Sequence, residues 1–257
     1  MSPFARPPAQ RPLVRVEGLT VGYGTTTALD DVSFELDRGC SVAVLGPNGS
    51  GKSTLFGALV GLVSCARGSV EVAAERIAYL PQHLNLEPSF PLTVADVADM
   101  GRWGRRGWLR RSDAADRQAA ERAMELLGVA DLANRRLHEL SGGQRQRALL
   151  AQIAAQDAEL LLLDEPASGV DRPTERALRA LIASWRDEGR TVMVATHDLE
   201  AAARNYDVVL ALNGRLVAHG PPARVCVEPV LRETFSGHVA RLGDDLVDTS
   251  HHHHEAG

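Results

Sequence analysis

Hydrophobic positions along the chain switch between the two-residue period of strands and the longer period of helices. Short apolar runs before residue 90 predict strands at 13–17, 32–36, 41–45, 69–72 and 77–80. Later runs predict strands at 160–163, 191–195, 208–212 and 215–218. Asn213-Gly214 separates the last two runs and is a strong hairpin turn signal.

Helical periodicity fills most of the remaining chain. A helix is expected at 52–62, where Leu55, Phe56, Leu59 and Leu62 share one face. Residues 92–156 contain no convincing strand, and 114–127 reads as a helix. Another helix is expected at 173–186, after Asp171 and before Gly189, and a short one from Asp198. The pattern predicts an α/β fold with a helical insertion in its middle.

Residues 46–53 read GPNGSGKS and match the phosphate-loop pattern G-x-x-x-x-G-K-[ST]. Its glycines let backbone N–H groups converge on a phosphate chain, and the following helix adds the positive end of its dipole. Lys52, the only lysine among the 28 basic residues, is expected at the β- and γ-phosphates, and Ser53 at Mg²⁺. The alternative is a glycine-rich turn that binds nothing. The nucleotide-contacting residues expected here are Gly46, Pro47, Asn48, Gly49, Ser50, Gly51, Lys52, Ser53 and Thr54.

Two acids follow the leucine run at 160–163. Asp164 and Glu165 fit a buried strand that delivers carboxylates at its carboxyl end, where the sites of α/β proteins lie. Asp164 is expected to hold Mg²⁺ through water, and Glu165 to act as general base toward the attacking water. A solvated acidic turn is the alternative, and the phosphate loop on the same sheet argues against it.

The chain resembles the ATP-binding cassette (ABC) family of transporter ATPases from about residue 13 to about residue 224. The most specific feature is the signature Leu-Ser-Gly-Gly-Gln at 140–144, between the phosphate loop and the acid pair. The resemblance implies a P-loop NTPase core with an antiparallel β subdomain and an inserted α-helical subdomain. It also implies a head-to-tail homodimer with ATP and Mg²⁺, in which Ser141, Gly142, Gly143 and Gln144 meet the ATP of the other chain.

Smaller motifs fall at the family's positions. By resemblance, Tyr23 stacks on adenine, although a strand-end tyrosine without that role is the alternative. Gln82 resembles the glutamine that touches Mg²⁺ and the attacking water, and His197 the switch histidine that bonds the γ-phosphate. Asp171 ends the Ser-Gly-Val-Asp segment that resembles the loop crossing the dimer interface. The catalytic set implied is thus Lys52, Gln82, Glu165 and His197, and the metal set Ser53, Gln82 and Asp164.

Composition sets the remaining limits. Of the 257 residues, 44% are hydrophobic and 24% charged, as in globular proteins, and the net charge of −5 does not indicate nucleic-acid binding. No apolar run is long enough to span a bilayer, no secretion signal is apparent, and three widely spaced cysteines suit a reducing compartment. We expect a proline-rich extension at 1–12, an ATPase domain at 13–240 with a helical subdomain at about 85–156, and a tail at 241–257.

A subunit without a membrane span resembles the ATPases of ABC importers. Such a subunit implies separate transmembrane permease subunits, an extracytoplasmic substrate-binding protein and a place at the cytoplasmic face of the plasma membrane. Residues 101–111 carry no acid; Trp103 and Trp108 lie among Arg102, Arg105, Arg106, Arg110 and Arg111. These arginines and tryptophans suit docking to acidic groups or anionic lipid, and a solvated basic loop is the alternative.

The substrate rests on weaker features. Segments at 89–94, 100–102 and 235–238 resemble the zinc and manganese importer branch of the family. His251, His252, His253 and His254 follow three aspartates in the tail, a composition that suits Zn²⁺; a cloning tag is the alternative origin of the run. Two other functions stay open, an importer ATPase for a siderophore or vitamin and an ABC ATPase that acts without a membrane partner.

Overall fold

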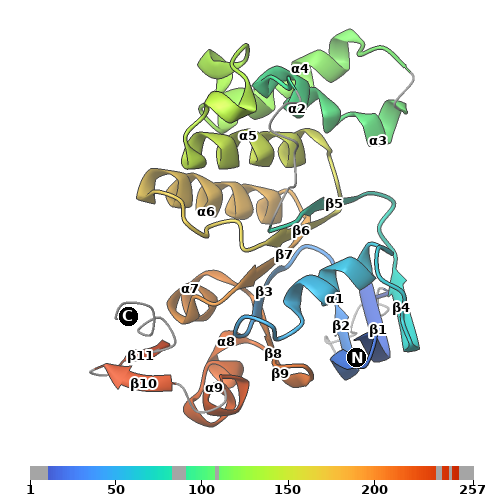
Figure 1. Cartoon of the computed structure of the whole chain (residues 1–257), viewed down its shortest axis with the longest axis vertical. Helices are drawn as coiled ribbons and strands as arrows, with labels where there is room; N and C mark the ends of the chain where they lie inside the picture. Colours follow the sequence, from blue (N-terminus) through green and yellow to red (C-terminus); the bar gives the residue numbers. More distant parts are fainter. Residues whose placement is uncertain (1–10, 83–90, 108–109, 236–238, 243–244, 249–257) are drawn as a thin grey trace, which may run out of the picture. The chain divides into compact units, whose positions relative to one another are not determined.

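Two units make up the chain, residues 1–74 with 196–257 and residues 75–195. The computed structural model describes residues 11–82, 91–107, 110–235, 239–242 and 245–248 (Figure 1). Strands and helices both contribute to each unit. The α/β class predicted from the hydrophobic pattern is confirmed.

The first unit contains an antiparallel sheet in the order β2-β1-β4. Its strands are β1 (Val14–Tyr23), β2 (Thr26–Leu36) and β4 (Arg67–Val72). β1 and β2 are longer than predicted, because the pairing shifts register between Val16 and Leu19, around Gly18 with a φ of 59°. Such an irregularity breaks the alternation from which strands are read in a sequence.

The first unit also holds β3 (Ser41–Leu45), which pairs in parallel with β8 (Val208–Leu212). β8 turns at Asn213-Gly214 into antiparallel β9 (Leu216–Gly220), which confirms the predicted hairpin. The helices of this unit are α1 (Lys52–Leu59), α7 (Leu199–Asn205), α8 (Pro222–Val225) and α9 (Glu228–Thr234). Leu45, Val209, Leu231 and Phe235 lie in one apolar cluster that joins strands to helices.

Helix α1 is shorter than predicted. It ends at Leu59 because Gly61 adopts a left-handed φ of 75°, and Leu62 N–H turns back to bond the Gly57 carbonyl at 2.8 Å. Leu62 is therefore 74% exposed, and its assignment to the buried face of the helix is wrong.

A two-stranded hairpin follows near the carboxyl end. It consists of β10 (Val239–Leu242) and β11 (Asp245–Asp248) in antiparallel register, and it contacts α7 (Figure 1). The sequence pattern did not predict these strands. β10 runs across the expected boundary at residue 240 between domain and tail.

The second unit is built on three parallel strands in the order β5-β6-β7. They are β5 (Ile77–Leu80), β6 (Leu160–Asp164) and β7 (Thr191–Thr196). Every residue of β6 is buried, since it has a partner strand on each side. This burial explains why its sequence is a continuous apolar run.

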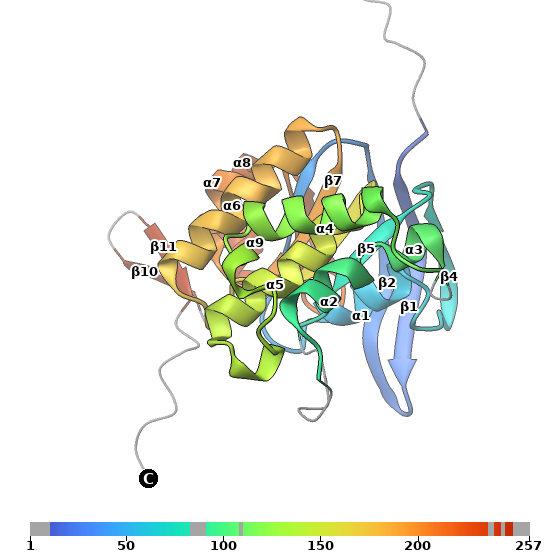
Figure 2. The same ribbon diagram turned by 90° about the horizontal axis from the view of Figure 1, so that it is seen from above.

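Its helices are α2 (Val94–Met100), α3 (Trp103–Arg106), α4 (Ala114–Leu126), α5 (Gly142–Ala155) and α6 (Arg172–Asp187). Two 3₁₀ turns, η1 (Ala130–Leu132) and η2 (Leu137–Glu139), join α4 to α5. α2 and α4 both pack on α5 (Figure 2). α6 begins at the Asp171 cap and buries Leu178, Leu181, Ile182 and Trp185.

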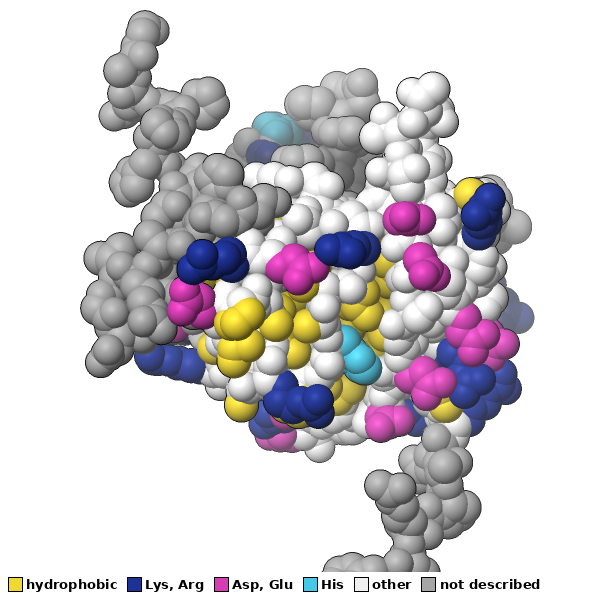
Figure 3. Space-filling model, turned by 90° about the horizontal axis from the view of Figure 1, so that it is seen from below, with side chains coloured by type: hydrophobic (Ala, Val, Ile, Leu, Met, Phe, Trp, Pro, Cys, Tyr) yellow, Lys and Arg dark blue, Asp and Glu magenta, His cyan; other side chains and the backbone are white. Residues whose placement is uncertain are grey.

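Two surface properties bear on function. Within the described residues, no helix has both the length and the apolar character needed to cross a bilayer. Basic and acidic side chains lie interspersed around hydrophobic surface on the face drawn in Figure 3.

Candidate functional site: a phosphate loop and an acidic strand end

The phosphate loop joins β3 to α1 in the first unit. Gly49 and Gly51 adopt left-handed φ angles of 80° and 96°, which glycine reaches without strain. At Gly46, an added Cβ would collide with the Leu212 carbonyl oxygen and would lie 2.6 Å from Ser50 Oγ. The backbone therefore excludes larger residues at the places where the pattern requires glycine.

Lys52 and Ser50 are both buried within this loop. Lys52 is 5% exposed, and its Nζ donates to the carbonyl oxygens of Gly46 at 2.8 Å and Pro47 at 3.0 Å. These bonds hold the ammonium against the loop, at the amino end of α1. Ser50 Oγ is buried and has no hydrogen-bond partner among the described residues. A buried polar atom without a partner is costly, so this loop fits a ligand rich in oxygen.

Other residues expected at the nucleotide lie in the same unit. Ser53 is exposed in the first turn of α1, next to half-buried Thr54, and Asn48 is exposed in the loop. Tyr23 is 55% exposed at the end of β1, so its ring is accessible for stacking. His197 is partly buried between the end of β7 and the Asp198 cap of α7. Their roles at a nucleotide remain predictions.

The acidic strand end lies in the second unit. Asp164 is the last residue of β6 and is 2% exposed, whereas Glu165 is half-buried. Gln82 Nε2 donates to Glu165 Oε2 at 2.9 Å, although 83 residues separate the two in the chain. β5 and β6 bring these residues together because they are parallel neighbours that end at the same edge.

Glu165 has a left-handed backbone, with a φ of 47°. This conformation is uncommon for any residue with a Cβ, and it requires support from the surroundings. Glu165 N–H donates to the Ala195 carbonyl at 3.1 Å, and Ser168 N–H donates to the Glu165 carbonyl at 3.1 Å. Gln146 Nε2 of α5 donates to the next carbonyl, that of Pro166, at 2.9 Å.

The signature segment forms the amino end of α5. Ser141 Oγ accepts from Gln144 N–H at 3.3 Å, and Ser141 N–H donates to Gln144 Oε1 at 3.0 Å. This reciprocal pair satisfies two backbone donors of the helix end. Gly142 is exposed, and an added Cβ would meet nothing within 4 Å. The tip of the helix is therefore open for contact.

Gly143 lies on the opposite side of this tip, against the start of α6. An added Cβ would be 3.1 Å from Thr174 Oγ1 and 3.4 Å from the Asp171 carboxylate. Asp171 Oδ1 accepts from Thr174 N–H at 2.9 Å. The Thr174 side chain and backbone N–H beside the carboxylate, with a smaller contribution from Arg147, lower the pKa of Asp171 below its ordinary 3.8. The carboxylate is therefore charged at neutral pH.

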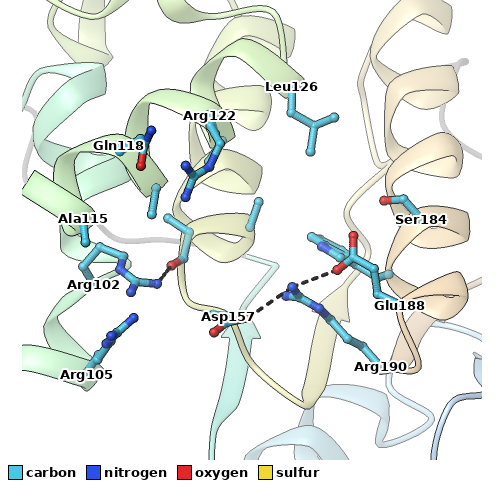
Figure 4. A pocket seen from close by; sticks show the side chains of 15 residues that line it. Arg102, Arg105, Ala115, Gln118, Arg122, Leu126, Asp157, Ser184, Glu188 and Arg190 are labelled. Carbon is cyan, nitrogen blue, oxygen red and sulfur yellow. Dashed lines mark hydrogen bonds and ion pairs between the residues drawn. The ribbon is translucent and has the colours of Figure 1, made fainter.

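Two residues of the basic segment, Arg102 and Arg105, line a pocket of about 470 Å³ in the second unit (Figure 4). Arg102, Arg105, Arg122 and Arg190 line it from several elements. Arg102 is not available for docking, because it is 3% exposed, pairs with Asp116 at 3.1 Å and donates to the Ala155 carbonyl at 2.6 Å. The sequence interpretation of Arg102 as a docking residue is wrong. Trp103 is 42% exposed, as a docking anchor requires.

The oxygen donors named for Mg²⁺ are the Ser53 hydroxyl, the Gln82 amide and the Asp164 carboxylate. Hydroxyl, amide and carboxylate oxygens suit this hard cation, which also takes ligands from phosphates and water. Ser53 belongs to the first unit, and Gln82 and Asp164 to the second. In the part of the chain that the structure describes, no three His, Cys, Asp or Glu residues gather as a separate metal site.

Several expected features lie wholly or partly outside the described residues. They are the histidine run at 251–254, Trp108, most of the extension at 1–12 and of the tail at 241–257, and parts of the segments at 89–94 and 235–238. One contact at the site was not predicted, that of Gln146 with Pro166. Only its spacing, three residues after Gly143 and thus on the same helix face, could have drawn attention to Gln146.

Comparison with known proteins gives the same picture. A family model described as "ABC transporter" matches residues 29–168. The manganese transport system ATP-binding protein MntB of Bacillus subtilis is 38% identical over 93% of this chain and 98% of its own length. The zinc transport system ATP-binding protein TroB of Treponema pallidum is 38% identical over 88% of each chain. The chelated iron transport system membrane protein YfeB of Yersinia pestis is 39% identical over 95% of this chain and 87% of its own.

Solved structures agree with the sequence relatives. An inward-facing ABC transporter of the metal-chelate type has a TM-score of 0.80 at 28% identity and covers 92% of this chain and 96% of its own. CbiO1 from Clostridium perfringens, part of the transporter complex cbiONQ, has a TM-score of 0.70 at 26% identity and covers 87% of this chain and 94% of its own. The chain therefore belongs to the ABC transporter family, as one of its ATP-hydrolysing subunits.

Proposed function

We propose that this protein hydrolyses MgATP to drive the import of a divalent metal ion, manganese or zinc, through separate transmembrane permease subunits. It acts at the cytoplasmic face of the plasma membrane as a homodimer in the ATP-bound state. An extracytoplasmic substrate-binding protein supplies the metal ion. The observation that carries the hydrolytic part is the hydrogen bond between Gln82 and Glu165 at the end of β6.

The phosphate loop supplies the binding energy for ATP. Its backbone N–H groups, turned inward by the glycines, surround the phosphates, and Lys52 adds a cation at the β- and γ-phosphates. Ser50 Oγ gains the partner that it lacks among the described residues. Ser53, Gln82 and Asp164 would hold Mg²⁺, which would neutralise part of the negative charge on the phosphates.

Glu165 takes a proton from the water that attacks the γ-phosphorus. A general base needs a fixed position relative to the proton it accepts. The carboxylate of Glu165 is held by Gln82, and its backbone by bonds to Ala195 and Ser168. His197 is assigned to the γ-phosphate, where an imidazole N–H stabilises the negative charge on the oxygens of the transferred phosphoryl group.

The second half of each ATP site comes from the partner copy. The exposed amino end of α5 carries Ser141, Gly142 and Gln144, and a helix start of this kind binds anions. In a head-to-tail dimer it closes over the γ-phosphate bound by the other phosphate loop. Hydrolysis removes that phosphate, so the dimer loses the contact and opens.

Metal import is supported by the relatives. The manganese and zinc system proteins of Bacillus subtilis and Treponema pallidum match this chain over most of their length. The Yersinia pestis relative belongs to a chelated iron system at similar identity, so iron is the second candidate. Exposed Trp103 and Arg105 on α3 offer the permease an aromatic anchor and a cation.

Two experiments test these assignments. Glu165→Gln protein should bind ATP, dimerise and turn over very slowly, whereas Lys52→Ala should lose nucleotide binding. A Glu165→Gln protein that stays monomeric with ATP and hydrolyses ATP at the wild-type rate would contradict the assignment of Glu165 as general base. Uptake of radioactive manganese, zinc and iron by cells that lack the gene, with wild-type or Lys52→Ala protein restored, identifies the metal ion. Equal uptake of all three metals in both strains would exclude metal import.

A further inference from the structure

Gln146 lies outside every motif assigned above, yet its side chain contacts the loop that carries the general base. It is the fifth residue of α5, and Nε2 reaches the Pro166 carbonyl at 2.9 Å. Pro166 directly follows Glu165 and is buried. Because proline has no N–H, the carbonyl is the only backbone group through which hydrogen bonds can fix Pro166.

This bond completes the support of a strained backbone. A left-handed glutamate persists only where neighbouring groups determine its conformation. Glu165 N–H and carbonyl are held by Ala195 and Ser168, both through backbone groups. Gln146 holds the following peptide and does so through a side chain. It is therefore the member of this set that a substitution can remove without changing the main chain.

The contact is part of a longer seam between α5 and the segment that follows Glu165. Gly143, one helical turn before Gln146, approaches Asp171 and Thr174 so closely that a Cβ would need neighbouring atoms to shift. The first two turns of α5 thus contact residues 166–174 at two points, through the Gln146 hydrogen bond and through the close packing of Gly143. Ser141 and Gly142, at the tip of the same helix, stay exposed.

We propose that Gln146 is a positioning residue for Glu165 and that it connects the two ATP sites of the dimer. This inference rests on the proposed function, in which Glu165 acts on ATP held by its own chain and the tip of α5 meets ATP held by the partner. A displacement of α5 on closing over that second ATP is transmitted by the Gln146 bond to the carbonyl next to Glu165. Gln146 touches no ATP itself.

The test replaces the Gln146 amide, which donates the hydrogen bond, by a group of similar size and shape that cannot donate. In Gln146→Glu, a carboxylate oxygen stands where Nε2 donated, so the bond to the Pro166 carbonyl is lost. Gln152→Glu is the matched control, because it adds the same charge to the same helix and Gln152 has no side-chain bond within the described residues. Gln146→Met, which has a similar length and no charge, separates loss of the bond from the added charge.

We expect kcat to fall roughly ten- to a hundredfold in both Gln146 variants, since small misplacements of a catalytic group have effects of this size. The KM for ATP and the melting temperature should stay close to those of Gln152→Glu. The Hill coefficient for ATP should fall toward one. A kcat within twofold of the control in both Gln146 variants would overturn the proposal.

A double-mutant cycle identifies the route of the effect. In a Glu165→Gln background, measured by single turnover, Gln146→Met should cause no further loss, because the group it positions is already neutral. In a His197→Ala background it should slow turnover by its full factor. An equal factor in both backgrounds would reject the positioning role. Wild-type protein without ATPase activity would overturn the proposed function as well, whereas active wild type with inert Gln146 variants would overturn this inference alone.

Discussion

Replacing Glu165 by glycine should abolish hydrolysis and stabilise the fold. A left-handed backbone costs an L-residue roughly 1–2 kcal/mol, which glycine does not pay. Glycine loses about 0.5–1 kcal/mol more conformational entropy on folding. The hydrogen bond from Gln82 to Glu165 contributes little to the free energy of unfolding, because Gln82 is exposed. The net gain therefore lies between about 0 and 1.5 kcal/mol, a rise in melting temperature of at most roughly 6 °C for a chain of this size.

Asp31→Gly is the matched control for this change. Asp31 also has a left-handed backbone, with a φ of 49°, but it is exposed on β2 and belongs to no expected site. Aspartate tolerates this conformation better than glutamate does, so we expect a smaller change in melting temperature and wild-type ATPase activity. Calorimetry and a phosphate-release assay measure the two properties. If Glu165→Gly melts more than 2 °C below the wild type, or hydrolyses ATP as the wild type does, the reasoning from strain to catalysis is refuted.

Three further predictions concern the first unit, α6 and the thiols. Gly46→Ala should lose ATP binding measured by fluorescent nucleotide titration, because its Cβ collides with the Leu212 carbonyl; unchanged affinity would contradict the role of this glycine. Because the pKa of Asp171 is lowered from its ordinary 3.8, the ionised carboxylate stabilises the fold above that value, and this stabilisation is lost as the pH falls through the folded-state pKa. In Asp171→Asn, the free energy of unfolding should therefore depend less on pH in the acid range. An unchanged pH dependence would show that this carboxylate does not contribute to it. At pH 8 a thiol reagent should label exposed Cys65 well before Cys40, whose pKa is raised to about 11 by burial and by Asp207 and Asp37. Mass spectrometry measures the labelling of each cysteine, and equal labelling rates would contradict this expectation.

Local chemistry made the phosphate loop and the strand that carries Glu165 predictable. A tight turn at Gly46, Gly49 and Gly51 depends on residues within a few positions, so its pattern is visible in the sequence. The burial of β6 likewise appears as a run of leucines. The helix start at the signature is likewise set locally, because Ser141 and Gln144, three residues apart, form the capping box of α5.

A local helix stop and contacts over long sequence distances could not be predicted in this way. The end of α1 depends on one nearby glycine, Gly61, whose left-handed conformation the helical periodicity does not indicate. Arg102 reads as a surface residue within a basic run, and only its pairing with Asp116 explains why it is buried. Gln146 is one of several polar residues on α5, and its partner Pro166 lies 20 positions away.

The buried Arg102 guanidinium has a mechanical consequence for the second unit. It follows α2, bonds Asp116 of α4 and caps the last carbonyl of α5, so three helices meet at one cation. Removing one partner of such a pair is expensive, because the other charge stays buried. A force on Trp103, the adjacent residue, is therefore expected to move α2, α4 and α5 together rather than to bend a loop. Such a movement would displace Ser141, at the opposite end of α5 from the Arg102 contact.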